Sequence, residues 1–466
     1  QIQNNFSIFG DRHTWTFGAT LERYKSENVF YPGSQSIYVY ESLEDFYTDA
    51  RDYLANPNRT TSPVTLSRFQ VRWMNIPGME KPLQPLKVWY PGAYVQDAIQ
   101  INDRLRITAG VRVDVPFFEN TAYANSDADN LTFRDEKGNS VRYPTGELPD
   151  PKLLFSPRFG FNYDVFGDRT TQIRGGTGIF TGPPPYVWIS NQIGNTGVLT
   201  GFEQIDNTTN RPFHPDPNHY KPTNVTGAPA SSYELALTDP DFKFPQVWRS
   251  SLALDQRLPF GFIGTVEGLY SRDVNGIYYI NANLPAPSAT VRDGSHERPR
   301  WTDSCPDPGF QTRIHCHVAN AIVLKNQSEG YSWMISASLE KAFSSGLFLK
   351  AAYSYGAAKN TVDPGSIAAG SWTGNQHPGD PNNPGLGYSS ASPGHRVFLA
   401  GSYRKDWLPF GATTISFFGE GRNAGLASYT YAGDVNGDGT SGNDLIYVPR
   451  DISEMNFEEY TQPASG

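Results

Sequence analysis

Hydrophobic and polar residues alternate at every second position along several stretches of this chain. In the clearest stretch, residues 105–114, the odd positions are Leu, Ile, Ala, Val and Val, whereas the even positions include Arg, Thr and Asp. Because side chains of a strand point alternately to opposite faces, one face suits lipid or a core and the other suits water. Residues 93–101 form a second such run, and the polar turn Asn102-Asp103-Arg104 joins the two runs into a hairpin.

The same unit recurs along the chain. We expect antiparallel hairpins over residues 93–115, 156–181, 246–273, 332–355 and 396–420, preceded by an incomplete hairpin that includes His13–Arg23. We expect the apolar face to point toward lipid at Ile107, Val111, Val113, Leu347, Leu349 and Ala351. The turns inside the hairpins are short, whereas the connections between them are long, polar and rich in Gly, Pro, Asn and Asp. These connections are residues 116–152, 183–243, 285–330 and 359–394.

Short turns that alternate with long loops are typical of outer-membrane barrels, whose long loops are extracellular. The sequence therefore predicts an all-β fold: an antiparallel transmembrane β-barrel with long extracellular loops. The chain would supply about a dozen or more strands of a larger barrel. The alternative is a soluble β-sandwich, which would leave the long loops unexplained.

Composition narrows the class of protein further. The chain has 466 residues, of which 14% are aromatic and 18% are charged, below the roughly 25% usual for soluble domains. It contains no run of about 18 apolar residues, which excludes a helical membrane protein. Aromatic residues near the strand ends fit the interfacial girdles of barrels. The net charge of −9 argues against nucleic acid as a partner.

Local motifs carry a resemblance to a known family. Residues 94–97 (YVQD) and 103–114 (DRLRITAGVRVD) resemble a strand pair of TonB-dependent outer-membrane receptors, and residues 156–160 (SPRFG) resemble one of their strand starts. Three further motifs are similar to the Oar-like branch, which is related to SusC-type receptors of Bacteroidota. They are residues 268–275 (GLYSRDVN), 393–397 (PGHRV) and 434–449 (DVNGDGTSGNDLIYVP).

The resemblance implies a bacterial outer-membrane transporter that imports a nutrient or peptide-sized ligand and is not an enzyme. It implies outer-membrane lipid and the TonB system as partners, and a surface lipoprotein or other outer-membrane proteins as further ones. The alternative is a structural or secretion-associated barrel that scaffolds a surface complex. The family's plug domain and closing strands are not visible here. We therefore interpret residues 1–421 as a partial barrel and residues 422–466 as an Asp/Gly-rich extracellular loop.

Residues 434–445 match part of a calcium-binding loop. Asp434, Asn436, Asp438, Gly439 and Thr440 occupy positions 1, 3, 5, 6 and 7 of an EF-hand-type loop. The glutamate expected at position 12 is replaced by Leu445, so Asp444 is the nearest substitute. We expect a Ca²⁺ site formed by Asp434, Asn436, Asp438, Thr440 and Asp444. The alternative is a loop in which these side chains bind local backbone N–H groups.

The two cysteines lie in one predicted extracellular loop. In an oxidising compartment, Cys305 and Cys316 are expected to form a disulfide. His315 and His317 flank Cys316, which raises a metal site as an alternative. Neighbouring residues of an extended strand point to opposite faces, so joint ligation by this triplet is awkward.

Charged residues of the predicted lumen face are the remaining functional candidates. No motif of a hydrolase elbow, a phosphate-binding loop or a zinc protease occurs in the sequence. The glycines of residues 175–178 are interpreted as sites of close backbone approach. Polar faces of adjacent hairpins converge inside a barrel, where they hydrate the lumen, hold a plug or contact substrate. The candidates are Arg106, Arg112, Asp114, Arg158, Asp164, Gln172 and Arg174. Substrate selection is expected in loops 186–202 and 360–388.

Overall fold

A computed structural model describes residues 1–293, 296–302, 305, 312–409 and 411–454 of the chain. Residues 455–466 of the predicted Asp/Gly-rich loop, and Phe410 in the last hairpin turn, lie outside the described residues. None of the helices in these ranges is both long enough and apolar enough to span a membrane.

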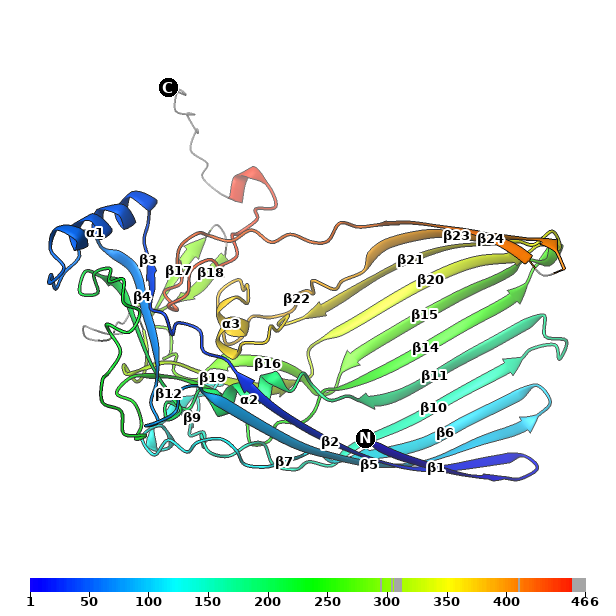
Figure 1. Cartoon of the computed structure of the whole chain (residues 1–466). Helices are drawn as coiled ribbons and strands as arrows, with labels where there is room; N and C mark the ends of the chain where they lie inside the picture. The colour runs from blue at the N-terminus through cyan, green and yellow to red at the C-terminus, as the bar shows by residue number, and fades with distance from the viewer. Residues whose placement is uncertain (294–295, 303–304, 306–311, 410, 455–466) are drawn as a thin grey trace.

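One large antiparallel sheet contains the predicted hairpins (Figure 1). Its strands follow each other in chain order, so each strand pairs with its neighbours in the sequence. In the described part of the chain this sheet has 14 strands, two of which, β7 (Phe117–Phe118) and β22 (Gly387–Tyr388), lie off the main path. The others are β1 (Ile2–Phe9), β2 (His13–Val29), β5 (Leu83–Asn102), β6 (Leu105–Asp114), β10 (Leu154–Asp164), β11 (Thr171–Thr181), β14 (Gln246–Arg257), β15 (Ile263–Asp273), β20 (Tyr331–Ala342), β21 (Leu347–Asn360), β23 (Gly394–Leu408) and β24 (Gly411–Arg422).

The predicted hairpins are confirmed, and the β-sandwich alternative is wrong. Register fixes which side chains share a face: Val111 pairs with Pro157 and Val95, and Arg112 pairs with Ser156 and Tyr94. The six residues predicted to face lipid all fall on the same face of the sheet. We call this face the outward face and the opposite one the inward face. Large apolar side chains of the outward face, such as Ile335 (56% exposed) and Val397 (54%), are not covered by a second sheet of the described chain.

The glycines of β11 occupy positions where no side chain fits. A Cβ atom on Gly176 would lie 2.9 Å from the carbonyl oxygen of Phe159, and one on Gly178 would lie 2.9 Å from that of Pro157. The interpretation of this cluster as a site of close backbone approach is therefore confirmed, because a neighbouring strand's backbone fills the space.

The long connections pack together at the opposite end of the sheet from the short turns (Figure 1). We name this region the loop layer; it comprises residues 30–82, 115–153, 182–245, 274–330, 361–393 and 423–454, as far as these are described. Its helices and strands are β3 (Ile37–Val39), α1 (Leu43–Ala55), β4 (Leu66–Met74), η1 (Ala128–Asn130), β8 (Phe133–Arg134), β9 (Ser140–Val141), α2 (Val187–Gly194), β12 (Thr200–Thr208), β13 (Tyr233–Thr238), β16 (Gly276–Asn281), β17 (Ala289–Asp293), β18 (His296–Arg300), β19 (Val318–Gln327), α3 (Ala368–Thr373) and η3 (Ile452–Glu454). A further short helix, η2 (Pro259–Gly261), forms one of the hairpin turns.

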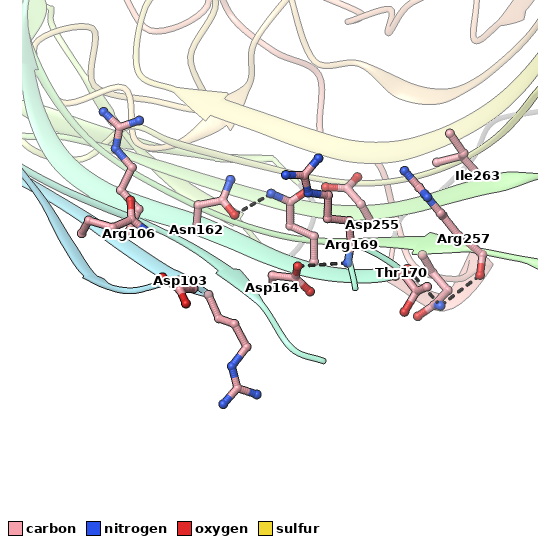
Figure 2. Close-up of a pocket in the computed structure, with 13 residues that line it drawn as sticks. Asp103, Arg106, Asn162, Asp164, Arg169, Thr170, Asp255, Arg257 and Ile263 are labelled. Atoms are coloured by element: carbon pink, nitrogen blue, oxygen red, sulfur yellow. Dashed lines mark hydrogen bonds between the residues drawn. The ribbon is translucent and has the colours of Figure 1, made fainter. Parts of the chain in front are cut away.

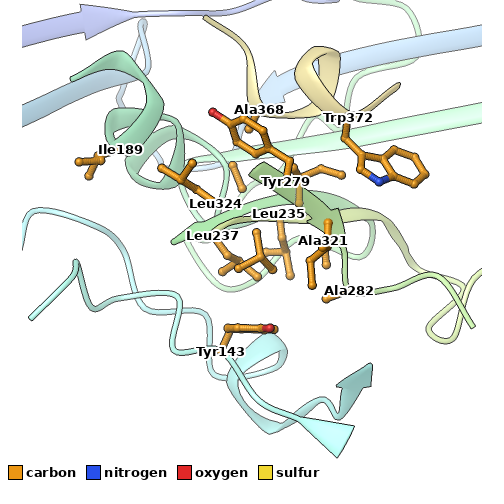
Figure 3. Packing of buried hydrophobic residues seen from close by; sticks show 14 of the residues in the cluster. Tyr143, Ile189, Leu235, Leu237, Tyr279, Ala282, Ala321, Leu324, Ala368 and Trp372 are labelled. Atoms are coloured by element: carbon orange, nitrogen blue, oxygen red, sulfur yellow. The ribbon is translucent and has the colours of Figure 1, made fainter. Parts of the chain in front are cut away.

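A hydrophobic core holds the loop layer together (Figure 3). Its centre is a small sheet in which β19 pairs with β13 on one side and with β16 on the other. Residues 321–324 of β19 are continuously apolar and fully buried, as expected for a strand covered on both faces. Ile189 of α2 and Trp372 of α3 pack into the same core. Inward-facing Leu86, Val88 and Tyr90 of β5 belong to it too, so the loop layer rests on the inward face of the sheet.

The structure departs from the sequence prediction in this layer. The connections were expected as long polar loops, but their apolar residues form strands and helices that pair between different loops. Residues 30–82, which the sequence analysis did not single out as a loop, contribute α1 and β4. The reason is physical: a short apolar run buried by a distant segment carries no periodicity of its own.

Candidate functional site

All seven predicted lumen residues lie on the inward face. Arg106 pairs with Asn162, Arg112 pairs with Ser156, and Asp164 pairs with Gln172. Because alternate residues share a face, Asp114, Arg158 and Arg174 occupy that face as well. The structure thus places these residues together on one wall, and it divides them into four groups by their contacts.

Arg106, Asp164 and Gln172 line a cleft of about 440 Å³ near the short turns (Figure 2). The cleft also includes Arg169, Asp255 and Arg257, and its walls come from three neighbouring hairpins. The Asp164 carboxylate accepts hydrogen bonds from the backbone N–H groups of Gly167 (2.9 Å) and Arg169 (3.0 Å). That carboxylate therefore shapes the turn, and the guanidinium and amide groups around it form a polar surface.

Arg174 forms an ion pair across the sheet. Its Nε lies 2.9 Å from a carboxylate oxygen of Asp255 in β14, and its Nη2 lies 3.7 Å from Glu267 in β15. Asp255 also accepts a hydrogen bond from the hydroxyl of Thr265 at 2.7 Å. Sequence analysis missed both acidic partners, although they alternate on the polar face of their strands. Their pairing with Arg174 depends on the strand register, which the sequence does not show.

Arg112 and Asp114 form a separate pair below the loop layer. The Arg112 Nη2 donates to Asp114 at 2.6 Å and to the hydroxyl of Thr20 at 2.8 Å, and Asp114 is 1% exposed. Gly92 on the adjacent strand leaves room for the pair, because a Cβ there would lie 2.3 Å from the Asp114 carboxylate. The remaining candidate, Arg158, lies over the ring of Phe180 at 4.7 Å. These contacts hold the wall's inward side chains in place.

A polar cavity lies within the loop layer. We call it the loop chamber; its volume is about 670 Å³. Both segments expected to select substrate reach it, the first through Phe202 and the second through Ala369 and Gly370. Its other walls include parts of β3, β4 and β19, Arg313, and residues 439–441. A chamber of this size accommodates a ligand of small-molecule dimensions.

Arginine side chains dominate the charge of the loop chamber. Arg72 lies 2.9 Å from Glu234 and stacks over Phe202 at 4.5 Å. Arg68 lies 2.6 Å from Asp206, and Gln70 donates to Gln204 at 2.7 Å. A third arginine, Arg313, donates to the carbonyl of Ala319 at 2.6 Å. Burial lowers the pKa of Arg313 to about 10, which still leaves it charged at neutral pH.

The two cysteines are joined at the edge of the loop layer. Cys305 and Cys316 form a disulfide with a Cα–Cα distance of 5.5 Å. The flanking histidines have separate partners: His315 Nε2 lies 2.8 Å from the carbonyl oxygen of Thr132, and His317 Nε2 lies 3.0 Å from Asp127. The hydroxyl of Tyr233 donates to the same Asp127 carboxylate at 2.6 Å, and these hydrogen bonds lower the pKa of that carboxyl group. The geometry therefore does not support joint metal ligation by residues 315–317.

Replacing both cysteines with serine should loosen this part of the loop layer and leave the wall folded. The disulfide closes a loop with a sequence separation of 11, for which chain entropy predicts a loss of about 3 kcal/mol. The sheet does not depend on this loop for its ladder. Limited proteolysis should therefore cut near residue 305 sooner, while the heat-modifiable mobility of the folded barrel on gels stays unchanged. A loss of that mobility would contradict the prediction.

Residues 434–444 are packed inside the loop layer, and their side chains bind local backbone groups. Asp434 accepts from the N–H groups of Gly437 (2.6 Å), Asp438 (3.1 Å) and Gly439 (2.9 Å). Asp438 accepts from the N–H of Thr440 at 2.8 Å, and Asp444 accepts from that of Val435 at 2.8 Å. The side-chain oxygen of Asn436 accepts from the backbone N–H of Asp438 at 3.0 Å. Burial and the neighbouring carboxylates raise the pKa of Asp434 to about 6.

Comparison with known proteins gives the class of protein. A family profile described as "Outer membrane beta barrel domain" matches residues 1–434. The chain belongs to this family, so it is a β-barrel protein of the bacterial outer membrane. No curated protein sequence matches the chain.

Solved structures similar to the chain include outer-membrane transporters. They include the FrpB iron transporter from Neisseria meningitidis, with a TM-score of 0.38 and 10% identity, covering 90% of this chain and 42% of that chain. The outer membrane transporter YddB from Escherichia coli has a TM-score of 0.41 and 13% identity, covering 86% of this chain and 39% of that one. The chain thus spans less than half the length of these two transporters.

Proposed function

We propose that the chain forms the wall and loops of a TonB-dependent outer-membrane transporter of the Oar-like branch, which imports a nutrient or peptide-sized ligand. Family membership supports the barrel and its location. The motifs at residues 393–397 and 434–449 support the Oar-like branch. In this proposal the loop layer is extracellular, in keeping with the long outer loops of such barrels.

The loop chamber is the observation that carries the import proposal. Loops that served only as attachment surfaces would need an exposed face, whereas here five connections fold inward and line a cavity of about 670 Å³. The lining combines arginines, amides and the ring of Phe202, which bind polar ligands by hydrogen bonds and stacking. The ligand would bind first in the loop chamber and then pass along the inward wall. The TonB system would act through a plug segment, with a surface lipoprotein as an additional partner.

Filling the loop chamber tests the proposal. Gly370 lines the chamber, and the nearest neighbour of an added Cβ would be 3.7 Å away, so Gly370→Phe adds a ring at the chamber wall without a backbone clash. In cells that carry the full-length protein, this variant should lose most TonB-dependent uptake of a labelled peptide mixture. Gly182→Phe is the matched control, because nothing lies within 4 Å of a Cβ there and Gly182 does not line the chamber.

The outcomes separate import from the structural or secretion role. Uptake lost in the first variant and retained in the control supports import. Uptake that is equal in both variants and in a strain without the TonB system contradicts it. A change in the exported proteins with no change in uptake would favour the secretion-associated barrel instead.

A further inference from the structure

The loop of residues 434–444 is buried more deeply than a surface turn. Asn436, Asp438 and Asp444 are each 0% exposed. The backbone N–H of Trp301 donates to the Asn436 carbonyl at 2.7 Å, and the Asn436 amide donates to Gly379 at 2.9 Å. Two connections of the loop layer therefore clasp this loop from different sides. Burial at this level removes carboxylates from water, which is costly unless their charge is compensated.

Positive side chains compensate part of this charge. The loop holds three carboxylates, those of Asp434, Asp438 and Asp444. Arg298 lies 3.7 Å from Asp444, and Arg313 donates to the backbone carbonyl of Asp438 at 3.0 Å. His377 Nε2 lies 3.4 Å from Asp438. The carboxylate of Asp438 accepts hydrogen bonds from the backbone N–H of Thr440 and from the side-chain amides of Asn436 and Asn443.

Several buried oxygen atoms of the same loop have no hydrogen-bond partner. They are Oγ1 of Thr440, Oδ1 of Asn443 and Oδ1 of Asp444, on side chains that are 9%, 1% and 0% exposed. In the described chain, 13 buried side-chain atoms lack a hydrogen-bond partner, and three of these atoms belong to residues 440–444. Buried polar atoms normally find partners, so a group of orphaned oxygens indicates a bound species. A hydroxyl oxygen, an amide oxygen and a carboxylate oxygen that all lack a donor are suited to binding a cation.

We infer that residues 434–444 bind one Ca²⁺ ion through oxygen atoms of the carboxylates and of Thr440 and Asn443. A mixed set of carboxylate, amide and hydroxyl oxygens suits Ca²⁺, which accepts six to eight oxygen ligands in flexible geometry. Mg²⁺ demands a strict octahedron and retains its waters, so it fits this set less well.

The arrangement also indicates how tight the site is. Among the described residues, no three His, Cys, Asp or Glu side chains stand together as a metal cage. The ion must therefore draw the carboxylates closer together, while their other lone pairs keep accepting from the backbone N–H groups. That rearrangement, together with Leu445 at the twelfth position, points to the weak range of about 10⁻⁴ to 10⁻³ M.

The ion would order one wall of the loop chamber. Gly439, Thr440 and Ser441 line that wall. On the other side of the loop, the N–H of His377 donates to the Asn443 carbonyl at 3.0 Å, and the N–H of Leu445 donates to the His377 carbonyl at 3.0 Å. Binding would fix residues 434–444 against residues 274–330 and 361–393. This inference does not depend on the transport function.

Lanthanide luminescence on the intact, full-length protein tests the site. Trp301 adjoins the loop, so Tb³⁺ in the site should emit when tryptophan is excited, and Ca²⁺ should displace it with saturation. Asp438→Asn and Asp444→Asn should each weaken Ca²⁺ competition by at least about tenfold, because each removes a charge from the ion but keeps an oxygen for the turn. Asp216→Asn is the matched control: Asp216 accepts from the N–H of Asn218 at 2.9 Å in an exposed turn outside the loop.

The purely hydrogen-bonded turn predicts the opposite results. Without an ion, either substitution would relieve repulsion between buried carboxylates, so protease resistance of residues 434–444 would rise or stay equal. With an ion, chelation by EDTA should speed cleavage there in the wild type and have no effect in the variants. The inference is overturned if no saturable displacement occurs, or if both variants match the control while retaining folded-barrel gel mobility.

Discussion

Ala351→Arg is expected to destabilise the barrel in lipid, whereas Ala352→Arg is not. The two alanines are adjacent in β21, yet Ala351 lies on the outward face and Ala352 lies on the inward face. Between the interface and the midplane of the bilayer, an outward arginine costs about 1–3 kcal/mol. An inward arginine meets a polar wall, where substitutions fall within about 0.5 kcal/mol.

Urea titration of the full-length protein folded in phosphatidylcholine vesicles measures both variants under the same conditions. The alanine pair is matched in residue type, strand and depth, so a difference between the variants reports the face alone. Equal free energies of unfolding, or a larger loss at position 352, would mean that the face assignment is reversed.

The second large effect is expected at Asp49, at the outer part of the loop layer. This carboxylate is 0% exposed, and it accepts from the Tyr40 hydroxyl at 2.6 Å, the Phe213 N–H at 2.9 Å and the Arg59 guanidinium. Asp49→Ala leaves Arg59, whose side chain is 5% exposed, without its buried partner. Breaking a buried pair in this way costs about 3–5 kcal/mol. The loss should be local, because Asp49 joins α1 to residue 213 and not to the wall.

Hydrogen–deuterium exchange of residues 40–60 and 210–220 checks this expectation, with protection of the wall strands as the internal reference. Asp52→Ala is the control, because Asp52 contacts the same Arg59 at 2.9 Å but is 40% exposed. An exposed partner contributes about 1 kcal/mol or less. Comparable exchange in both variants would show that Asp49 does not hold the two segments together.

The wall could be predicted from the sequence because its information is local. Alternation in residues 105–114 assigns each side chain to a face, and short turns join strands that pair with their sequence neighbours. The same alternation alone predicts that all seven lumen candidates lie on the polar face of their strands. It does not show that Arg174 meets Asp255, because that pairing joins two strands and depends on their register.

The loop layer could not be predicted because its information is distributed over the chain. The burial of Asp49 depends on residue 213, and the clasp on residues 434–444 depends on Trp301 and His377. The motif at residues 434–445 predicted a turn with oxygen side chains, which the structure contains. Its deep burial has no local signal, since the sequence there is polar and rich in glycine.

The strand pairings of the loop layer have a consequence for the order of folding. Thr200 of β12 pairs with Met74 of β4, and Tyr233 of β13 pairs with Val318 of β19. Such contacts must close long chain loops before they gain any stabilisation, so they form slowly, whereas each hairpin of the wall closes a short loop. The individual hairpins therefore form first, and the loop layer condenses afterwards. Until then its apolar strands are exposed, so this interval is when the chain depends most on chaperones for protection from aggregation.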